Sequence, residues 1–319
     1  GMKYFLGVDI GGTKTAAGLL DADGHMLAEK EIPTLVHDGA ERIVRNTAQL
    51  ISSLAEQEGI KKSQLSYLGV GCPGTVNQKT GVVEYANNLY FEHVPLADML
   101  NHEVGLPVLL ENDANCAGLG EYWALPDREE VESFFMVTLG TGVGTAFIWK
   151  GQLFTGFNGA APEMGHCTLN AEGELCDCKN RGCWEVYCAG HALVRAGREA
   201  AKSCSDSLLW ELSGKDLEKL DGNLIFQAWR QGDEMAGKVV ERYLYYYKAG
   251  IGNVINAFQP QVLTIGGGIS RQGRLFIDTA NAAIAEYSYC KTVAQTQVRQ
   301  AVLGTKAGIY GAALLGAKR

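Results

Sequence analysis

Two glycine-rich loops, each set between two apolar runs, constrain this fold more than any other feature of the sequence. Residues 4–10 form an apolar run interrupted only by Asp9, which is typical of a strand buried on both faces. Gly11-Gly12-Thr13-Lys14 ends it, and a second apolar stretch at 16–20 leads into the turn sequence Asp-Ala-Asp-Gly. The first loop is therefore predicted to join two strands of a hairpin, not a strand to a long helix.

The same order of features recurs about one domain later in the chain. Residues 134–139 are apolar, Gly140-Thr141-Gly142 follows, and a second apolar stretch at 146–149 ends in a Lys-Gly turn. We interpret this recurrence as an internal duplication with one glycine loop in each domain. Chance similarity of two Gly/Thr loops is the alternative.

A third glycine run, Gly266-Gly267-Gly268, follows a buried strand predicted at 262–265. Glycine lets a backbone N–H reach a phosphate oxygen without an intervening side chain. Two such loops facing each other across a cleft could therefore hold one nucleotide from both sides. Tight turns are the alternative, and neither a P-loop nor a G-x-G-x-x-G motif followed by a helix is present.

Three helices stand out from the periodicity and the cap residues. Apolar residues recur at helical spacing between 43 and 54, Asp38 with Glu41 predicts a capping box, and Gly59 predicts the stop. A long helix over 235–258 has Tyr243 and Tyr247 on one broad apolar face, and we expect these tyrosines to pack in the core. A small-residue helix is expected at 307–317, returning to the first domain.

Composition excludes several classes of protein. A length of 319 residues suits two domains, and a net charge of −8 argues against broad nucleic-acid binding. No apolar run reaches the roughly 18 residues that a membrane span requires, and the first residues read as a strand, not as a signal peptide. Nine cysteines without an export signal favour reduced thiols, so we expect a cytoplasmic protein with no membrane partner.

An acidic triplet, Glu111-Asn112-Asp113, follows the strand predicted at 107–110. A carboxylate at the end of a strand suits a general base for phosphoryl transfer, which otherwise needs positioning and charge neutralisation. The alternative is helix capping, because residues 114–122 look helical and Asp and Asn often open helices. One segment can serve both roles.

One imidazole and three thiolates lie within 18 residues, at His166, Cys176, Cys178 and Cys183. This set completes a tetrahedron around Zn²⁺, as in structural zinc sites, and the close spacing of the cysteines favours one ion over disulfides. Five other cysteines, at 72, 116, 188, 204 and 290, fit no ligand spacing and are expected to be small buried hydrophobes.

Several motifs together resemble the ROK (repressor, open reading frame, kinase) family of the actin and hexokinase superfamily. They are Asp9-Ile-Gly-Gly-Thr-Lys14, the glycine loop at 139–144, Ile265-Gly-Gly-Gly-Ile269, and Glu163-Met-Gly-His166 followed by the cysteines and Glu185. The resemblance runs from residue 3 to about 315, with the motifs in the expected order. One departure is Lys179, which stands where the family pattern has glycine.

The resemblance implies an α/β, actin-like ATPase (ribonuclease H-like) fold, duplicated into two domains with a cleft between them. The domains expected are 1–118 plus 301–319, and a larger 119–300 that carries a zinc knuckle at 166–183. Family members are usually oligomers, so a homodimer or homotetramer is expected.

The resemblance also implies the roles of individual residues. Asp113 would take the proton from the attacking sugar hydroxyl, and Asp9 would hold Mg²⁺. Contacts to ATP would come from Gly11, Gly12, Thr13, Lys14, Gly140, Thr141, Gly142, Gly266, Gly267 and Gly268. Contacts to the sugar would come from Gly74, Asn87, Asn112, Glu163, His166 and Glu185, with the second nitrogen of His166 on zinc.

The function implied is ATP-dependent phosphorylation of a hexose at its 6-hydroxyl, with glucose as the commonest substrate of this pattern. Kinases for N-acetylmannosamine, N-acetylglucosamine, allose or fructose share nearly all of these residues. Two alternatives come from other classes. One is a sugar-responsive repressor. It is disfavoured because repressors of the family carry a DNA-binding winged helix ahead of the first glycine loop, and only eight residues precede Asp9 here. The other is a chaperone-type ATPase or assembly-forming protein, in which the zinc knuckle would have no purpose.

Overall fold

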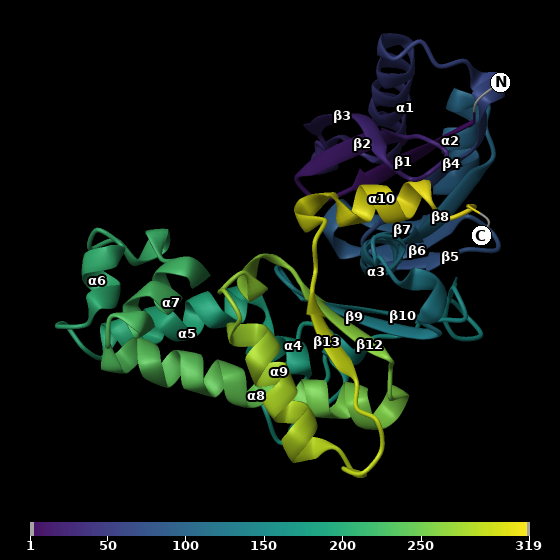
Figure 1. The fold of residues 1–319 in the computed structure, drawn as a ribbon. Helices are drawn as coiled ribbons and strands as arrows, with labels where there is room; N and C mark the ends of the chain where they lie inside the picture. Colours follow the sequence, from purple (N-terminus) through teal and green to yellow (C-terminus); the bar gives the residue numbers. More distant parts are fainter. Residues whose placement is uncertain (1–2, 318–319) are drawn as a thin grey trace. The chain divides into compact units, whose positions relative to one another are not determined.

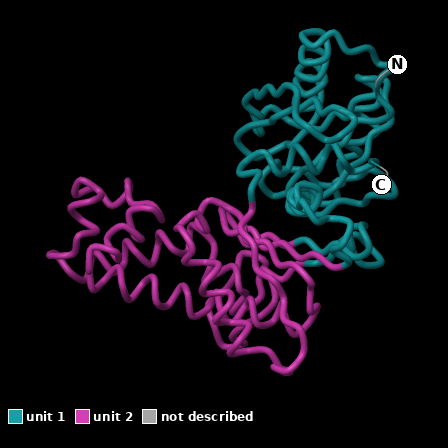
Figure 2. Tube along the Cα trace, viewed as in Figure 1, with its two compact units in different colours: residues 1–132, 146–162, 302–319 teal, residues 133–145, 163–301 magenta. Residues whose placement is uncertain are grey.

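A computed structural model of the chain describes residues 3–317 and divides into two compact units, coloured separately in Figure 2. Unit 1 comprises residues 1–132, 146–162 and 302–319, and unit 2 comprises 133–145 and 163–301. The domain boundaries predicted at 118/119 and 300/301 stay a prediction. The compact units divide instead after residues 132 and 301, and they place 146–162 with unit 1.

The first sheet is mixed and has the strand order β3-β2-β1-β4-β8. Its members are β1 (Tyr4–Ile10), β2 (Lys14–Leu20), β3 (Met26–Pro33), β4 (Leu65–Cys72) and β8 (Val108–Asn112). β1 pairs antiparallel with β2 and parallel with β4, and β4 pairs parallel with β8. The hairpin predicted around the first glycine loop is therefore confirmed.

The second sheet has the order β11-β10-β9-β12-β13, which repeats the first strand for strand. Its members are β9 (Ser133–Leu139), β10 (Val143–Trp149), β11 (Gln152–Leu153), β12 (Val262–Gly266) and β13 (Gln297–Gln300). β12 pairs parallel with β9 and β13, and β10 pairs antiparallel with β11. The equal order of the two sheets confirms the duplication inferred from the glycine loops.

A small antiparallel sheet follows β4, made of β5 (Thr75–Asn77), β6 (Val82–Ala86) and β7 (Phe91–Val94). Four α-helices of unit 1 accompany the two sheets: α1 (Ala40–Gln57), α2 (Leu96–Val104), α3 (Asp113–Trp123) and α10 (Ala307–Ala313). The C-terminal helix α10 packs on α3, β1 and β4, as Figure 1 shows. It therefore returns to unit 1, as predicted.

Glycines in the strands let α10 approach the first sheet closely. A Cβ on Gly69 of β4 would lie 1.6 Å from the carbonyl oxygen of Ala312, and one on Gly7 of β1 would lie 2.4 Å from Ala313 N. No side chain fits at either point. The packing of α10 against the sheet is therefore backbone to backbone.

Unit 2 is mostly helical around its part of the second sheet. Its α-helices are α4 (Trp184–Cys188), α5 (Gly190–Lys202), α6 (Leu208–Leu212), α7 (Gly222–Arg230), α8 (Glu234–Phe258) and α9 (Leu275–Tyr287). The long α8 packs against α4, α5, α7 and α9. Tyr243 and Tyr247 on α8 are buried, which confirms the core role predicted for them.

The start of α1 differs from the capping box predicted at Asp38 and Glu41. Asp38 ends a short 3-10 helix, and Gly39 is the residue that precedes α1, with φ 89° and no side-chain cap. The left-handed turn at glycine separates Asp38 from the helix, so its carboxylate cannot cap it. The predicted stop is confirmed, because Gly59 with φ 66° follows the last helical turn.

Within residues 3–317, no helix combines the length and the apolar character needed to cross a lipid bilayer.

Candidate functional site

In unit 1 the first glycine loop is held by hydrogen bonds to Thr34. The N–H of Gly11 donates to the carbonyl of Lys14 over 2.9 Å, the Thr34 hydroxyl donates to the Gly11 carbonyl over 2.7 Å, and the Thr34 N–H donates to the Thr13 carbonyl. The ammonium of Lys14 lies 3.4 Å from Glu31, and both side chains are largely exposed. Lys14 therefore forms a surface ion pair, which is expected to be weak.

Asp9 is the penultimate residue of β1, two positions before Gly11, and is partly buried. Burial, and secondarily the charge of Asp113, raise the pKa of the Asp9 carboxyl from 3.8 to about 7. Helix α10 lies against this carboxylate, because a Cβ on Gly308 would be 2.6 Å from Asp9 Oδ2. Unit 1 therefore brings together two carboxylates, and the charge of Asp113 makes Asp9 harder to ionise.

The alternative roles of the acidic triplet are divided between neighbouring residues. Asn112 is the N-cap of α3, and its Oδ1 accepts hydrogen bonds from the N–H groups of Ala114 and Asn115 at 2.9 and 3.2 Å. Asp113 is the first residue of the helix, and its Oδ1 accepts from the Ala114 N–H. Burial raises the pKa of Asp113 above its usual value. Since Asn112 is the cap, Asp113 is available for another role.

Asn112 also fixes the turn after β4. Its side-chain amide donates to the carbonyl of Gly74 over 2.8 Å. Gly74 has φ 90°, and a Cβ there would lie 2.1 Å from the carbonyl oxygen of Tyr85. Asn87 follows two residues later, is exposed, and accepts a 3.4 Å hydrogen bond from the Tyr85 hydroxyl. The structure thus groups Gly74, Asn87 and Asn112 on adjoining segments of unit 1.

Glu111, the first residue of the acidic triplet, was given no role of its own from the sequence. Its carboxylate is 4% exposed and accepts hydrogen bonds from Gln78 Nε2 at 3.1 Å, from Asn115 Nδ2 at 2.9 Å and from the Asn112 N–H at 2.8 Å. Burial raises the pKa of Glu111, against these hydrogen bonds. The triplet therefore forms hydrogen bonds with two turns: Asn112 bonds to the turn after β4, and Glu111 bonds to the turn after β5.

In unit 2 the other two glycine segments lie side by side. Gly266 of β12 is paired in register with Thr138 of β9. A Cβ on Gly267, whose φ is 86°, would lie 2.2 Å from the carbonyl oxygen of Leu139. By contrast, nothing lies within 4 Å of a Cβ built on Gly140 or Gly268. Those two glycines therefore face open space, as a phosphate-binding backbone requires.

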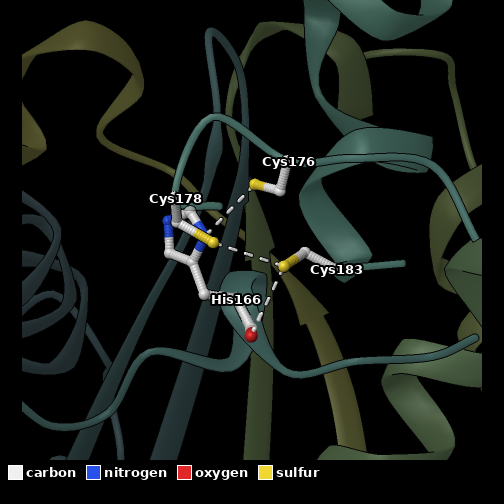
Figure 3. Close-up of side chains that lie close together, drawn as sticks. All are labelled: His166, Cys176, Cys178 and Cys183. Carbon is white, nitrogen blue, oxygen red and sulfur yellow. Dashed lines mark hydrogen bonds between the residues drawn. The ribbon is translucent and has the colours of Figure 1, made fainter. Parts of the chain in front are cut away.

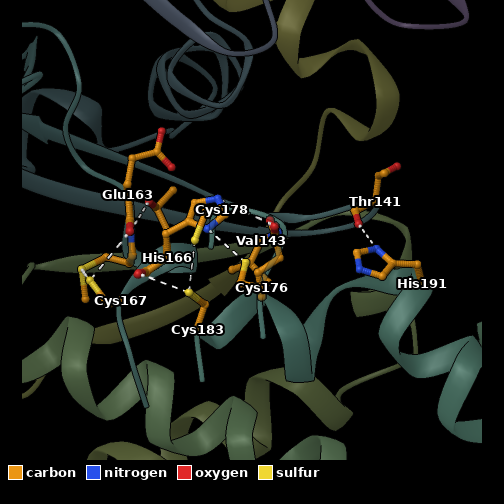
Figure 4. Close-up of polar contacts among 12 residues, drawn as sticks. Thr141, Val143, Glu163, His166, Cys167, Cys176, Cys178, Cys183 and His191 are labelled. Carbon is orange, nitrogen blue, oxygen red and sulfur yellow. Dashed lines mark hydrogen bonds and ion pairs between the residues drawn. The ribbon is translucent and has the colours of Figure 1, made fainter. Parts of the chain in front are cut away.

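Glu185 binds the second glycine loop directly. Its Oε1 accepts a 2.9 Å hydrogen bond from the Val143 N–H, and its Oε2 lies 3.7 Å from Nε2 of His166. Glu163 is exposed, and Figure 4 shows its carboxylate turned away from the thiols around His166. Unit 2 thus brings His166 and Glu185 together beside the glycine loop.

His191 and Cys167 were also missed, because neither belongs to a recognisable spacing. His191 Nδ1 lies 3.1 Å from the carbonyl oxygen of Thr141, so that nitrogen carries the proton and donates (Figure 4). The exposed Cys167 thiol lies 3.7 Å from the Glu163 carbonyl and is outside the thiol cluster. His191 therefore places an imidazole at the predicted nucleotide loop.

The four predicted zinc ligands converge, as Figure 3 shows. One donor atom from each of His166, Cys176, Cys178 and Cys183 lies within 4.8 Å of the others. His166 Nδ1 faces Cys176 Sγ at 3.7 Å, whereas its Nε2 faces Glu185. The Sγ atoms of Cys178 and Cys183 are 3.5 Å apart, too far for a disulfide. The donor set and its spacing fit a tetrahedral Zn²⁺ site.

The backbone of this knuckle carries a strained residue. Lys179 has φ 77°, in the left-handed region that glycine adopts without cost. Directly after Cys183, buried Trp184 fits against α8 only because residue 250 is glycine: a Cβ there would lie 1.9 Å from the indole ring.

Of the five cysteines predicted to be buried, Cys72, Cys116 and Cys188 are buried, whereas Cys204 and Cys290 are only partly buried, and for these two the prediction is wrong.

The comparisons with known proteins agree with one another. The sequence profile of the ROK family matches residues 5–319. A glucokinase of Thermotoga maritima is 35% identical over 97% of this chain and 95% of its own length. A ROK family glucokinase from Streptomyces griseus, solved with glucose and AMPPNP, is 34% identical, with a TM-score of 0.82 over 99% of both chains. The ROK hexokinase from Thermus thermophilus is 30% identical, with a TM-score of 0.81 over 98% of this chain and 97% of its own.

Proposed function

Because the chain belongs to the ROK family, we propose that it transfers the γ-phosphoryl group of ATP to the 6-hydroxyl of a hexose, preferentially glucose. The observation that carries the mechanism is the division of roles at the start of α3. Asn112 caps the helix, which leaves the Asp113 carboxylate, with its raised pKa, as the proton acceptor.

In the proposed reaction the 6-oxygen of the sugar attacks the γ-phosphorus of ATP while Asp113 accepts the proton of that hydroxyl. The bond between the γ-phosphorus and the bridging oxygen breaks, and ADP leaves. A base with a pKa above that of a free carboxylate is better matched to this proton at neutral pH. Asp9, whose pKa is raised to about 7, would become ionised when a cation binds beside it. Mg²⁺, when bound with ATP, supplies neutralisation of the phosphate charge.

We propose the following contacts to ATP and to the sugar. Backbone N–H groups of residues 11–14, 140–142 and 266–268 would contact ATP, and Gly140 and Gly268 are supported by the open space beside them. Sugar hydroxyls would be bound by Asn87, Asn112, Glu163, His166 and Glu185, next to Gly74. Asn112 has one amide hydrogen left for this contact, because its oxygen and its other hydrogen are already bonded within the protein.

We also propose that the cluster of His166 and the three cysteines holds a structural zinc ion. With Nδ1 of His166 on the metal, its Nε2 would point at Glu185 and the sugar, so zinc would fix the imidazole and not take part in phosphoryl transfer. Metal analysis of purified protein should give one zinc per chain. A zinc-free protein that keeps full sugar affinity would contradict this role.

A homodimer or homotetramer and a cytoplasmic location complete the proposal. The location is supported by nine cysteines that are all free thiols in the structure.

The test of the function is a substrate panel combined with substitutions at Asp113. Glucose, mannose, fructose, allose and the two N-acetylhexosamines are assayed by ADP release, with wild type, Asp113→Ala and Asp113→Asn. We expect the highest kcat/KM with glucose and a loss of kcat of at least about 10²-fold in both variants. Undiminished turnover in Asp113→Ala would refute the mechanism, and no turnover with any sugar would refute the activity.

A further inference from the structure

Glu121 is a buried carboxylate that the proposed reaction does not use. It lies eight residues after Asp113 on α3 and is 2% exposed. Within residues 3–317 no salt bridge reaches it. Burial raises its pKa, whereas its backbone hydrogen bonds oppose that rise. Burying a carboxylate without a cation beside it lowers the stability of the fold, so its hydrogen-bond partners should account for its position.

Its partners are two backbone N–H groups at the point where the chain re-enters unit 1. Glu121 Oε1 accepts from the N–H groups of Val302 and Leu303 at 3.1 and 2.7 Å, and Oε2 accepts from Val302 at 3.0 Å. Leu303 directly precedes the helical segment that continues into α10. The carboxylate therefore satisfies N–H groups at the beginning of that segment and clamps it to α3.

Below the clamp, α3 and α10 touch through their backbones. A Cβ on Gly120 would lie 2.4 Å from the carbonyl oxygen of Ala307, and one on Gly311 would lie 1.5 Å from that of Cys116. At these two glycines the nearest atoms of the partner helix belong to its backbone, so long side chains do not interlock there to fix the register of the two helices. A clamp at one end of the pair can supply that register.

Each helix of this pair contacts one carboxylate of the proposed reaction. α3 begins with Asp113, and Gly308 of α10 lies directly against Asp9. We propose that Glu121 is a positioning residue that sets the register of α10 along α3, and through it the spacing of Asp9 and Asp113. The inference rests on the roles proposed above for those two carboxylates.

The test compares Glu121→Ala and Glu121→Gln with a matched control, Asp233→Ala. Asp233 is also a carboxylate that accepts from two backbone N–H groups, those of Leu208 and Ala236, but it caps α8 in unit 2. Each full-length variant is assayed well below its Tm for kcat, for the KM of ATP and for glucose affinity without ATP. Hydrogen exchange reports on the N–H groups of Val302 and Leu303.

In Glu121→Ala we expect faster exchange at Val302 and Leu303, a fall in kcat on the order of tenfold to a hundredfold, and unchanged glucose affinity. Glu121→Gln keeps one acceptor oxygen, so its kcat and its exchange rates at Val302 and Leu303 should lie between those of Glu121→Ala and wild type. Asp233→Ala should lower the Tm and leave kcat unchanged.

A Glu121→Ala variant that loses only thermal stability, as the control does, would overturn the inference, and so would equal losses of glucose affinity and kcat. If Glu121→Ala does not fold, an unchanged kcat in Glu121→Gln with accelerated exchange overturns it. Failure of the proposed function is seen separately, as activity that persists in Asp113→Ala.

Discussion

A first side-chain carbon on Gly142 would lie 2.4 Å from the Oε1 atom of Glu185. The same oxygen accepts the N–H of the next residue, Val143, over 2.9 Å. Glycine at position 142 is therefore required by a carboxylate of the protein itself, independently of any phosphate. Gly140, two residues earlier in the same loop, has nothing within 4 Å of its Cβ position. One loop thus contains a glycine required by packing and a glycine that packing does not require.

Alanine substitutions at these two positions should separate the two requirements. Gly142→Ala should displace Glu185, lower the Tm by several degrees without any ligand, and weaken glucose affinity. Gly140→Ala should leave the ligand-free Tm unchanged and raise the KM for ATP, because its methyl group occupies space that a phosphate would need. Thermal melts and steady-state kinetics check both. A Gly140→Ala enzyme with wild-type KM for ATP would argue against a phosphate contact at that loop.

Groups of residues with a fixed spacing along the chain could be recognised from the sequence. The four residues proposed to bind zinc lie within 18 residues, and the glycine loops follow apolar runs, so both patterns are visible in one dimension. The repetition of the pattern predicted the duplication, and the equal strand order of the two sheets agrees with it. The helix at 113–123 was predicted within a residue of its bounds.

Residues whose role depends on distant partners could not be predicted. Glu121 bonds to residues 181 and 182 positions away, and Gln78 reaches Glu111 across 33 positions. A glutamate on a helix usually indicates a solvated face, and only the fold shows that this one is buried. The capping box at Asp38 failed for a related reason, because the backbone angle of Gly39 decides where the helix begins.

The pair of Glu111 and Gln78 can be tested by exchanging its partners. Glu111→Gln places two amides face to face, so the turn after β5 should loosen, with a loss of about 1–3 kcal/mol in the free energy of unfolding and a higher KM for the sugar. Adding Gln78→Glu restores one carboxylate and one amide in reversed order and should recover part of both losses. Urea unfolding and glucose kinetics measure the coupling. Additive losses in the double variant would contradict a direct link.

Asp9 should make the stability of the ligand-free protein depend on pH. Its folded pKa of about 7 lies above the unfolded value of 3.8, so the folded state binds the proton more tightly. The resulting stabilisation is complete below pH 3.8 and is lost as the pH rises through 7. Asp9→Asn lacks this titration. It should exceed wild type in stability by on the order of 2–4 kcal/mol at pH 8, with the difference shrinking toward pH 4.

The comparison requires buffers without Mg²⁺ and without chelators, so that no cation neutralises Asp9 and any zinc stays bound. Urea unfolding at several pH values between 4 and 8 gives the difference directly. The same variant should lose turnover, because the carboxylate proposed to hold Mg²⁺ is gone. A stability difference that does not change with pH would show that Asp9 is not the group that titrates.

Lys179 offers a test of the knuckle that leaves every ligand in place. Its φ of 77° costs a residue with a Cβ roughly 1 kcal/mol more than glycine, partly offset by the greater freedom of glycine in the unfolded chain. Lys179→Gly should therefore raise the free energy of unfolding by up to about 1 kcal/mol. The gain should be largest with zinc bound, because a filled site holds the loop in this conformation. Urea unfolding with and without zinc measures it.

Lys215→Gly is the matched control, because Lys215 also lies in unit 2 with a positive φ, 62°, but outside the zinc ligands. It should give a similar gain that does not depend on zinc. If Lys179→Gly destabilises the zinc-bound protein while the control stabilises it, the lysine side chain contributes contacts that outweigh the backbone strain. Equal gains in both variants with and without zinc would instead mean that residue 179 keeps its conformation when the metal is absent.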